Sequence, residues 1–179
     1  MLMKRKSKRI SKAYWIWFLF SQEDNKKLIK IKKIINNLFK GPNFKIHLTT
    51  IGPYLKFNKK DFENIRLISK KIKKFKIKLE NYQFSNEKFT SFYIGVKKTK
   101  KLLAIRKNFY NLNYKKINLK YKPHVSLFYG NKDLKTKKRV IKILPKLNKF
   151  ITIDKLCIVD VNEKINKWKI VKTFKLKDE

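Results

Sequence analysis

The chain has 179 residues, 49 of them basic and 12 acidic, which gives a formal net charge of +37 at pH 7. Its content of 42% hydrophobic and 14% aromatic residues is enough for one packed domain and excludes wholesale disorder. The single cysteine, Cys157, excludes a disulfide framework or a cysteine metal site within one chain and suits a reducing compartment, so we expect a cytoplasmic protein.

The positive charge has two explanations of about equal weight. A field of this size attracts polyanions such as RNA. However, only five of the 49 basic residues are arginine and alanine occurs twice, whereas residues with AT-rich codons (Lys, Ile, Asn and Phe) are abundant, so genomic base composition also accounts for the charge. Because lysines occur in every segment, we expect at most nonspecific RNA contact through a basic surface.

The N-terminal residues 1–12 are basic and precede a short apolar run, a pattern that superficially resembles a signal peptide. The run is short and no small-residue cleavage site follows it, which favours a buried strand over 14–20 preceded by a flexible basic arm over 1–12. No stretch approaches the roughly 20 apolar residues that span a bilayer, so we expect no membrane partner. A membrane-surface protein held by the arm is a weaker alternative, and we expect a monomer.

The first half of the chain alternates strand and helix patterns. Ser21 and Asp24 are typical of a capping box, apolar residues then recur at three- and four-residue spacing, and Gly41-Pro42 ends that helix. The expected elements, in chain order, are a strand at 14–20, a helix at 21–40, a strand at 44–51, a helix marked by apolar residues from Phe62 to Phe75, and a strand at 76–84.

The second half repeats this order. Thr99 is a candidate helix cap, and Pro145 bends or ends the helix expected from Asp133. The expected elements are a strand at 92–96, a helix from 99 to about 110, a strand at 121–129, a helix from 133 to about 147, and strands at 151–160 and 168–176. In the last strand one alternating face carries the apolar residues Trp168, Ile170, Phe174 and Leu176.

The two histidines of the chain occur in two similar triplets, His47-Leu48-Thr49 and His124-Val125-Ser126. Each triplet lies in an expected strand, where side chains at positions i and i+2 share a face. Each histidine therefore shares a face with a hydroxyl residue. One such triplet carries almost no information, but two that use every histidine of the chain in equivalent strands are much more specific.

The two triplets occupy the same slot in the two halves, and a glycine (Gly52, Gly130) follows each. The sequence therefore predicts one domain over 13–179 with two pseudo-symmetric lobes, roughly 13–86 and 87–179. Packing about a pseudo-two-fold axis would bring both histidine strands to one central cleft.

Two histidines and two hydroxyls suit acid–base chemistry on a phosphate. With an ordinary pKa near 6.5, a neutral imidazole can take a proton from water while a protonated one gives a proton to a leaving alkoxide. The hydroxyls of Thr49 and Ser126 can donate to the phosphate oxygens, with Lys45, Lys122 or backbone N–H groups adding to this. Opening a strained cyclic phosphodiester requires this proton transfer and hydrogen bonding, and no metal. Two histidines and few acids also make a poor metal-ligand set, and we expect no cofactor.

Aromatic neighbours of the triplets fit a nucleotide pocket. Tyr54 follows the first triplet and Tyr129 the second, and a tyrosine ring can stack on a base. Core packing is an equally good interpretation of each.

These residues resemble the two-histidine phosphoesterase superfamily, closest to its cyclic phosphodiesterase branch. Residues 122–130 (KPHVSLFYG) are similar to that branch's Pro-His-hydrophobic-Ser-Leu-x-Tyr-Gly stretch, residues 45–52 (KIHLTTIG) to its first motif, and residues 168–176 to its closing strand. The resemblance covers about 14–176, and its most specific part is the second motif.

The resemblance implies a bilobal α+β fold, in which two pseudo-symmetric lobes of antiparallel sheet and helices, with interleaved strands, surround a central cleft. It also implies metal-independent hydrolysis of a 2′,3′-cyclic phosphate, on a nucleotide or an RNA end, or of ADP-ribose 1″,2″-cyclic phosphate. Carried over by position, His47 and His124 are the acid–base pair and Thr49 and Ser126 bind the phosphate. Which histidine is the base stays open. The alternatives are an RNA end-processing enzyme or RNA ligase of the same superfamily, and a non-catalytic RNA- or nucleotide-binding module.

Overall fold

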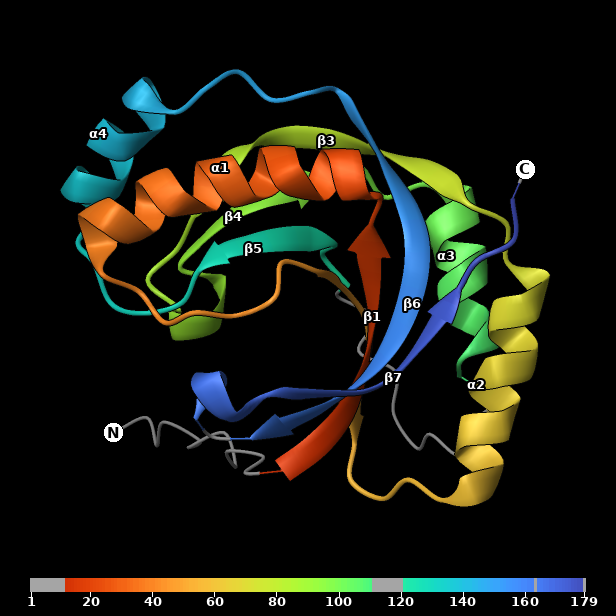
Figure 1. The fold of residues 1–179 in the computed structure, drawn as a ribbon. Helices are drawn as coiled ribbons and strands as arrows, with labels where there is room; N and C mark the ends of the chain where they lie inside the picture. Colours follow the sequence, from red (N-terminus) through yellow and green to blue (C-terminus); the bar gives the residue numbers. More distant parts are fainter. Residues whose placement is uncertain (1–11, 111–120, 163, 179) are drawn as a thin grey trace, which may run out of the picture.

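The structure is a computed structural model that describes residues 12–110, 121–162 and 164–178, and its described part contains seven strands and four α-helices (Figure 1). Two short 3₁₀ turns, at Lys88–Thr90 and Ile165–Lys167, complete it. The elements are β1 (Lys12–Phe20), α1 (Gln22–Phe39), β2 (Leu48–Tyr54), α2 (Lys59–Lys71), β3 (Phe75–Phe84), β4 (Phe92–Val96), α3 (Lys100–Asn108), β5 (His124–Phe128), α4 (Leu134–Ile143), β6 (Phe150–Asn162) and β7 (Lys169–Lys175).

The strands form one antiparallel sheet in the order β1-β2-β5-β4-β3-β6-β7, with a further pairing between β1 and β6. The long strand β6 pairs with β1 along most of its length and with β3 at its start, where Phe150 lies opposite Lys78. Strands of the first and second halves of the chain are therefore interleaved in the sheet, since β5 and β4 lie between β2 and β3. The α+β class and the antiparallel sheet predicted from the sequence are confirmed.

The two histidine-bearing segments meet at the centre of this arrangement. β2 and β5 are neighbours, and their paired residues are Leu48 and Val125, each of which directly follows a histidine. Both residues are fully buried in the main core. The pairing brings together the two segments that the sequence places in equivalent slots.

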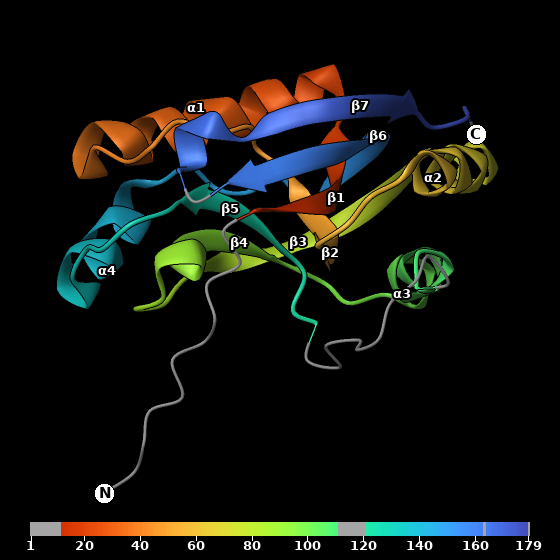
Figure 2. The ribbon, with the colours of Figure 1, turned by 90° about the horizontal axis from the view of Figure 1, so that it is seen from below.

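The helices lie toward two ends of the molecule. α2 and α3 lie next to each other at one end, α4 lies at the other, and α1 runs from the end that carries α4 toward the middle (Figure 1). Figure 2 shows the same division from below. The spacing of apolar residues in α1 predicted a buried stripe of Leu28, Ile31, Ile35 and Leu38. The first three are buried, but Leu38 is 47% exposed and Phe39 is buried in its place.

The two faces of β1 enter different clusters. Ile16, Phe18 and Phe20 belong to the main hydrophobic core. Trp17 and Leu19 point to the other face, where they form a small cluster with residues of β6 that includes the buried Cys157. Thr49 of β2 pairs with Trp17 of β1 and therefore lies on this second face as well.

Three sequence expectations about the elements were wrong in detail. β2 begins at Leu48, so His47 precedes the strand instead of lying within it, and α2 ends at Lys71, which leaves Phe75 as the first residue of β3. Ile170 of β7 is 41% exposed, so the alternating apolar face of that strand is not buried throughout.

The expected capping box of α1 is also only half right. The Ser21 hydroxyl accepts a hydrogen bond from the Asp24 N–H, but the Asp24 carboxylate accepts from the N–H of Thr152 instead of that of Ser21. The Ser21 N–H in turn donates to the carbonyl of Thr152. The start of α1 is thus tied to β6 and not closed on itself.

The first eleven residues of the expected basic arm lie outside the described residues, and Lys12 is the first residue of β1. None of the helices in the part of the chain that is described is long and apolar enough to cross a membrane.

Candidate active site

The register of β2 and β5 brings the histidines and hydroxyls together. Around the antiparallel pair Leu48 and Val125, position 47 lies opposite 126 and position 49 opposite 124. Because Leu48 and Val125 point into the core, their sequence neighbours lie toward the other face of the sheet. His47 is therefore placed beside Ser126 and His124 beside Thr49, on the face that carries Trp17.

The two histidines are held in the same way. The Nδ1 atom of His47 lies 2.7 Å from the carbonyl oxygen of Lys45, and that of His124 lies 2.8 Å from the carbonyl oxygen of Lys122. A carbonyl oxygen only accepts, so each Nδ1 must carry the proton. In the neutral imidazole this leaves the Nε2 lone pair of each ring for other chemistry.

His47 is almost fully buried, at 2% exposure. Its ring stacks on Trp17, with the centroids 3.5 Å apart and the planes 7° from parallel. Burial, together with smaller effects of the charges of His124 and Lys32, lowers the pKa of His47 to about 3, and the bond to the Lys45 carbonyl partly opposes this shift. His47 is therefore neutral at any pH near 7.

His124 is the first residue of β5 and is partly exposed. Its ring lies 5.0 Å from that of Tyr93. Burial lowers its pKa below the ordinary 6.5, and the bond to the Lys122 carbonyl partly opposes this. The two rings share a tautomer but differ in surroundings, since His47 is more enclosed and has a lysine nearby.

The two hydroxyl residues are also fixed by neighbours. Ser126 is buried and hydrogen-bonded to the Tyr129 hydroxyl, whose own pKa is raised by burial. Thr49 is half-buried, and its carbonyl oxygen accepts a hydrogen bond of 2.9 Å from the Tyr121 hydroxyl. The next carbonyl, of Thr50, accepts from Arg106 Nε at the same distance.

A buried lysine supports the segment that leads into His47. Lys32 of α1 is 5% exposed, donates from Nζ to the carbonyl oxygen of Phe44 at 2.5 Å, and lies 3.5 Å above the Phe44 ring. Burial lowers the pKa of Lys32 to about 8. Cys157 lies on the same face of the sheet as Trp17. Burial raises the pKa of its thiol to about 12, and the charge of Lys45 opposes this shift only in part.

The two tyrosines expected to stack on a base are both buried. Tyr54 is 2% exposed and donates its hydroxyl to the carbonyl of Phe109 at 3.3 Å, so it belongs to the core and we correct the expectation for it. Tyr129 is 5% exposed and stacks on Phe44, with centroids 4.2 Å apart. Tyr129 contacts the site through Ser126 and not through a free ring face.

The sequence did not single out Trp17, Lys32, Arg106 or Tyr121. Their roles depend on contacts with residues far along the chain, and no local spacing signals them. Arg106 gave the one hint in the sequence, because a cation on the apolar face of a helix needs a hydrogen-bond acceptor inside the protein.

Comparison with known proteins identifies the family and the fold of the chain. The model of the family described as cyclic phosphodiesterase-like proteins matches residues 16–178. No curated protein sequence matches the chain closely enough to report.

Solved structures with the same fold include E. coli LigT in complex with 3′-AMP, at 12% identity and a TM-score of 0.60, covering 93% of this chain and 99% of that one. The protein TT0787 of Thermus thermophilus matches at 12% identity and a TM-score of 0.59, with the same coverage of both chains. Kluyveromyces marxianus Usb1 matches at 10% identity and a TM-score of 0.51, covering 93% of this chain and 98% of that one.

Proposed function

The chain belongs to the cyclic phosphodiesterase-like protein family, within the two-histidine phosphoesterase superfamily, and from this premise we propose that it opens a cyclic phosphodiester to a phosphomonoester without a metal. The observation that carries the proposal is the paired geometry of His47 and His124. Both rings are fixed by the same Nδ1 bond to a carbonyl two residues earlier, on neighbouring segments.

We assign the base to His47 and the acid to His124. The buried, neutral His47 takes a proton from water at Nε2 while the water oxygen forms a bond to phosphorus. The bond from phosphorus to the leaving ring oxygen breaks, and that oxygen receives a proton from Nε2 of His124. The less enclosed His124 is the better acid because an anionic phosphate placed beside it raises its pKa and favours the protonated form.

The hydroxyls of Thr49 and Ser126 supply the remaining contacts in this proposal. Each lies opposite one histidine in the β2–β5 register, so the four groups surround one position on the sheet face. Hydroxyl donors there stabilise the charge that grows on the non-bridging phosphate oxygens in the transition state. A nucleotide substrate is supported by the similar E. coli LigT structures, which are complexes with 3′-AMP, ATP and NADP+.

The test uses EDTA-treated protein with a 2′,3′-cyclic nucleotide, an RNA with a cyclic phosphate end and ADP-ribose 1″,2″-cyclic phosphate. We expect metal-free opening of at least one, and a loss of roughly 10²–10⁴-fold in kcat for His47→Ala and for His124→Ala. Phe150→Ala, a change at an exposed residue of β6, is the control and should leave kcat unchanged.

Either histidine variant turning over at the wild-type rate would contradict the assignment. RNA binding without any opening would favour the non-catalytic binding module.

A further inference from the structure

A pair of aromatic residues at the surface, the exposed Phe89 and the half-buried Trp168, lies next to the proposed site. Phe89, in the 3₁₀ turn after β3, is 51% exposed, and its ring lies 6.4 Å from that of Trp168 at an interplanar angle of 23°. Trp168 also contacts Trp17, with centroids 5.7 Å apart, and Trp17 stacks on His47. A continuous line of aromatic rings therefore leads from the buried histidine to the surface.

The turn that carries Phe89 is firmly held, so its exposure is built into the fold. Ser85 donates its hydroxyl to the Thr90 carbonyl at 2.8 Å, and the Ser85 carbonyl accepts from Nζ of Lys137, a lysine that is 1% exposed. The Lys88 carbonyl accepts from the N–H of Gly130, just beyond β5. The Phe89 ring contacts the buried Tyr129, with centroids 5.6 Å apart, yet half of the residue is open to solvent. A fixed ring that faces solvent is what a base needs for stacking.

A basic groove continues from this pair. It has a volume of about 800 Å³ and passes Tyr129 and Gly130 at the end of β5. Its lining has four lysines and three asparagines, and no carboxylate is among the described lining residues. The lysines of the groove are Lys40, Lys88, Lys132 and Lys164.

We propose that this surface binds the RNA strand that precedes a cyclic phosphate end held by the histidines, with Phe89 and Trp168 stacking on a base and the groove taking backbone phosphates. The inference rests on the proposed function and narrows its substrate to an oligonucleotide. The strand is RNA because a 2′,3′-cyclic phosphate requires a 2′-hydroxyl. Lysine is frequent everywhere in this chain, so the fixed aromatic pair beside the site carries the inference more than the charge does.

The experiment compares kcat/KM for a trinucleotide RNA ending in a 2′,3′-cyclic phosphate with kcat/KM for the 2′,3′-cyclic form of its terminal nucleotide. We expect the trinucleotide to be preferred about tenfold or more, and Phe89→Ala to remove most of that preference, because base stacking on one aromatic ring contributes on this scale. Phe150→Ala removes an equally exposed phenylalanine, 49% exposed, at the start of β6 and should keep the preference.

The groove has its own readout. Raising the salt concentration should reduce the preference, and the double variant Lys132→Gln, Lys164→Gln should make that salt dependence shallower by roughly 0.7 in log–log slope for each lysine that contacts a phosphate. Equal kcat/KM for both substrates, or the same preference in Phe89→Ala as in wild type, would overturn the inference while leaving the proposed function in place.

Failure of the proposed function is separated by a binding measurement. If wild type opens neither substrate, fluorescence anisotropy of a labelled trinucleotide with a 3′-phosphate still decides the inference. Weaker binding by Phe89→Ala than by Phe150→Ala supports the RNA surface, and equal binding by the two variants overturns it.

Discussion

Each histidine of the site donates its Nδ1 proton to a carbonyl two residues earlier, and this local bond determines what the ring can do. It fixes the ring orientation and presents Nε2 as the reactive nitrogen on both strands. The remaining difference between the two is electrostatic. The pKa of His47 is lowered by near-complete burial and by the charges of Lys32 and His124, so its neutral form is strongly favoured. The pKa of His124 is also lowered by burial, but this residue is partly exposed.

This difference predicts the pH dependence of kcat/KM. His47 must be neutral to act as base, and with a pKa of about 3 it stays neutral from about pH 5 upward, so no loss of activity should appear on acidification to that point. His124 must be protonated to act as acid, and its pKa in the free protein lies below 6.5, so kcat/KM should fall as the pH rises above that lowered value.

The measurement is kcat/KM against pH in buffers of constant ionic strength. The decline in kcat should begin at a higher pH than the decline in kcat/KM, because the bound phosphate anion raises the pKa of His124. A fall in kcat/KM between about pH 7 and about pH 5, on protein that remains folded, would mean that the base titrates there and that the assignment of His47 is wrong.

At the scale of elements, the junction of β2 and β5 is short. The ladder between them has the single described pair Leu48 and Val125. The carbonyl oxygens of the next two residues of β2, Thr49 and Thr50, accept hydrogen bonds from the Tyr121 hydroxyl and from Arg106 Nε. These two side chains hold the strand that carries Thr49.

Tyr121→Phe tests whether the first of these bonds positions Thr49. The variant removes only the hydroxyl that donates to the Thr49 carbonyl, so we expect kcat to fall roughly tenfold with KM little changed, because a displaced donor affects the transition state most. Tyr82→Phe is the matched control, since Tyr82 donates its hydroxyl to the Pro145 carbonyl at 2.8 Å.

Both variants should lose about 1 kcal/mol of stability, as is typical of one hydrogen bond. A fall in kcat in Tyr121→Phe alone therefore reports the positioning of Thr49 and not a loss of folding. Equal kcat in the two variants would show that the Tyr121 bond is only structural. Arg106→Lys is a poorer probe, because Arg106 also lies over two tyrosine rings.

The order of elements was predictable from the sequence because it rests on local signals. Thr99 caps α3 through the Leu102 N–H, as expected. Asp133, the residue from which the next helix was expected, caps α4 through the Thr136 N–H. The predictions that failed depend on distant partners. Asp24 binds Thr152 in β6, which no local pattern reveals, and Tyr54 is drawn into the core under α3 by the Phe109 carbonyl.

The same limit applies to the site. Two triplets with matching spacing were enough to nominate four residues, because the chemistry needs those side chains and the chain has no other histidine. The supporting residues could not be predicted from the sequence. Lys32, for example, lies fifteen positions before His47, and nothing in the local sequence distinguishes it from the other lysines of its helix. Its role follows only from burial against Phe44.

For the whole molecule, the interleaved sheet makes the site a joint product of both halves of the chain. β6 joins β1 to β3, and β5 lies between β2 and β4, so neither half forms a separate sheet. Each half contributes one histidine and one hydroxyl to the same face. A glycine with positive φ ends each motif, Gly52 at 150° and Gly130 at 143°, where an L side chain would be strained.

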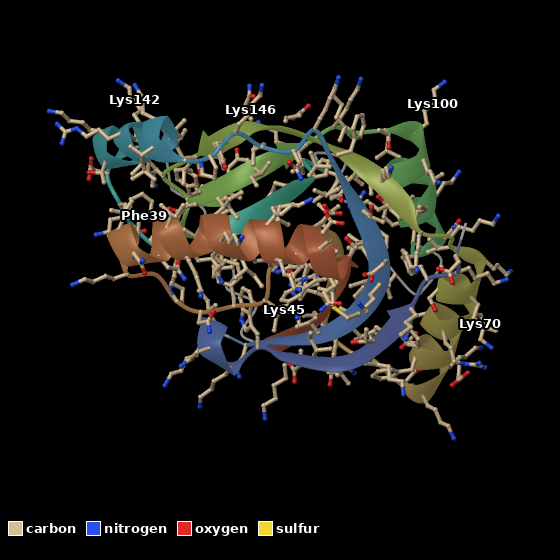
Figure 3. All side chains as sticks on the ribbon, turned by 45° about the horizontal axis from the view of Figure 1, so that its top comes forward. Phe39, Lys45, Lys70, Lys100, Lys142 and Lys146 are labelled. Atoms are coloured by element: carbon tan, nitrogen blue, oxygen red, sulfur yellow. The ribbon has the colours of Figure 1, made fainter. Side chains whose placement is uncertain are left out.

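The positive charge is also a property of the whole molecule. Lys70, Lys100, Lys142 and Lys146 project from different edges, whereas Lys45 lies near the middle (Figure 3). Among the residues that the structure describes there are four ion pairs: Lys27 with Glu23, Arg66 with Glu63, Lys74 with Asp178, and Lys155 with Asp154. With 49 basic and 12 acidic residues, repulsion between like charges must act across the entire surface.

Screening that repulsion should stabilise the fold. Raising NaCl from about 0.01 M to about 0.15 M shortens the Debye length from about 30 Å to about 8 Å, so we expect Tm to rise by several degrees. Calorimetry at constant pH measures it, with sodium fluoride at equal ionic strength as the comparison. Equal rises in both salts indicate general screening, whereas a Tm that stays flat or falls would mean that like-charge repulsion does not limit the stability of this protein.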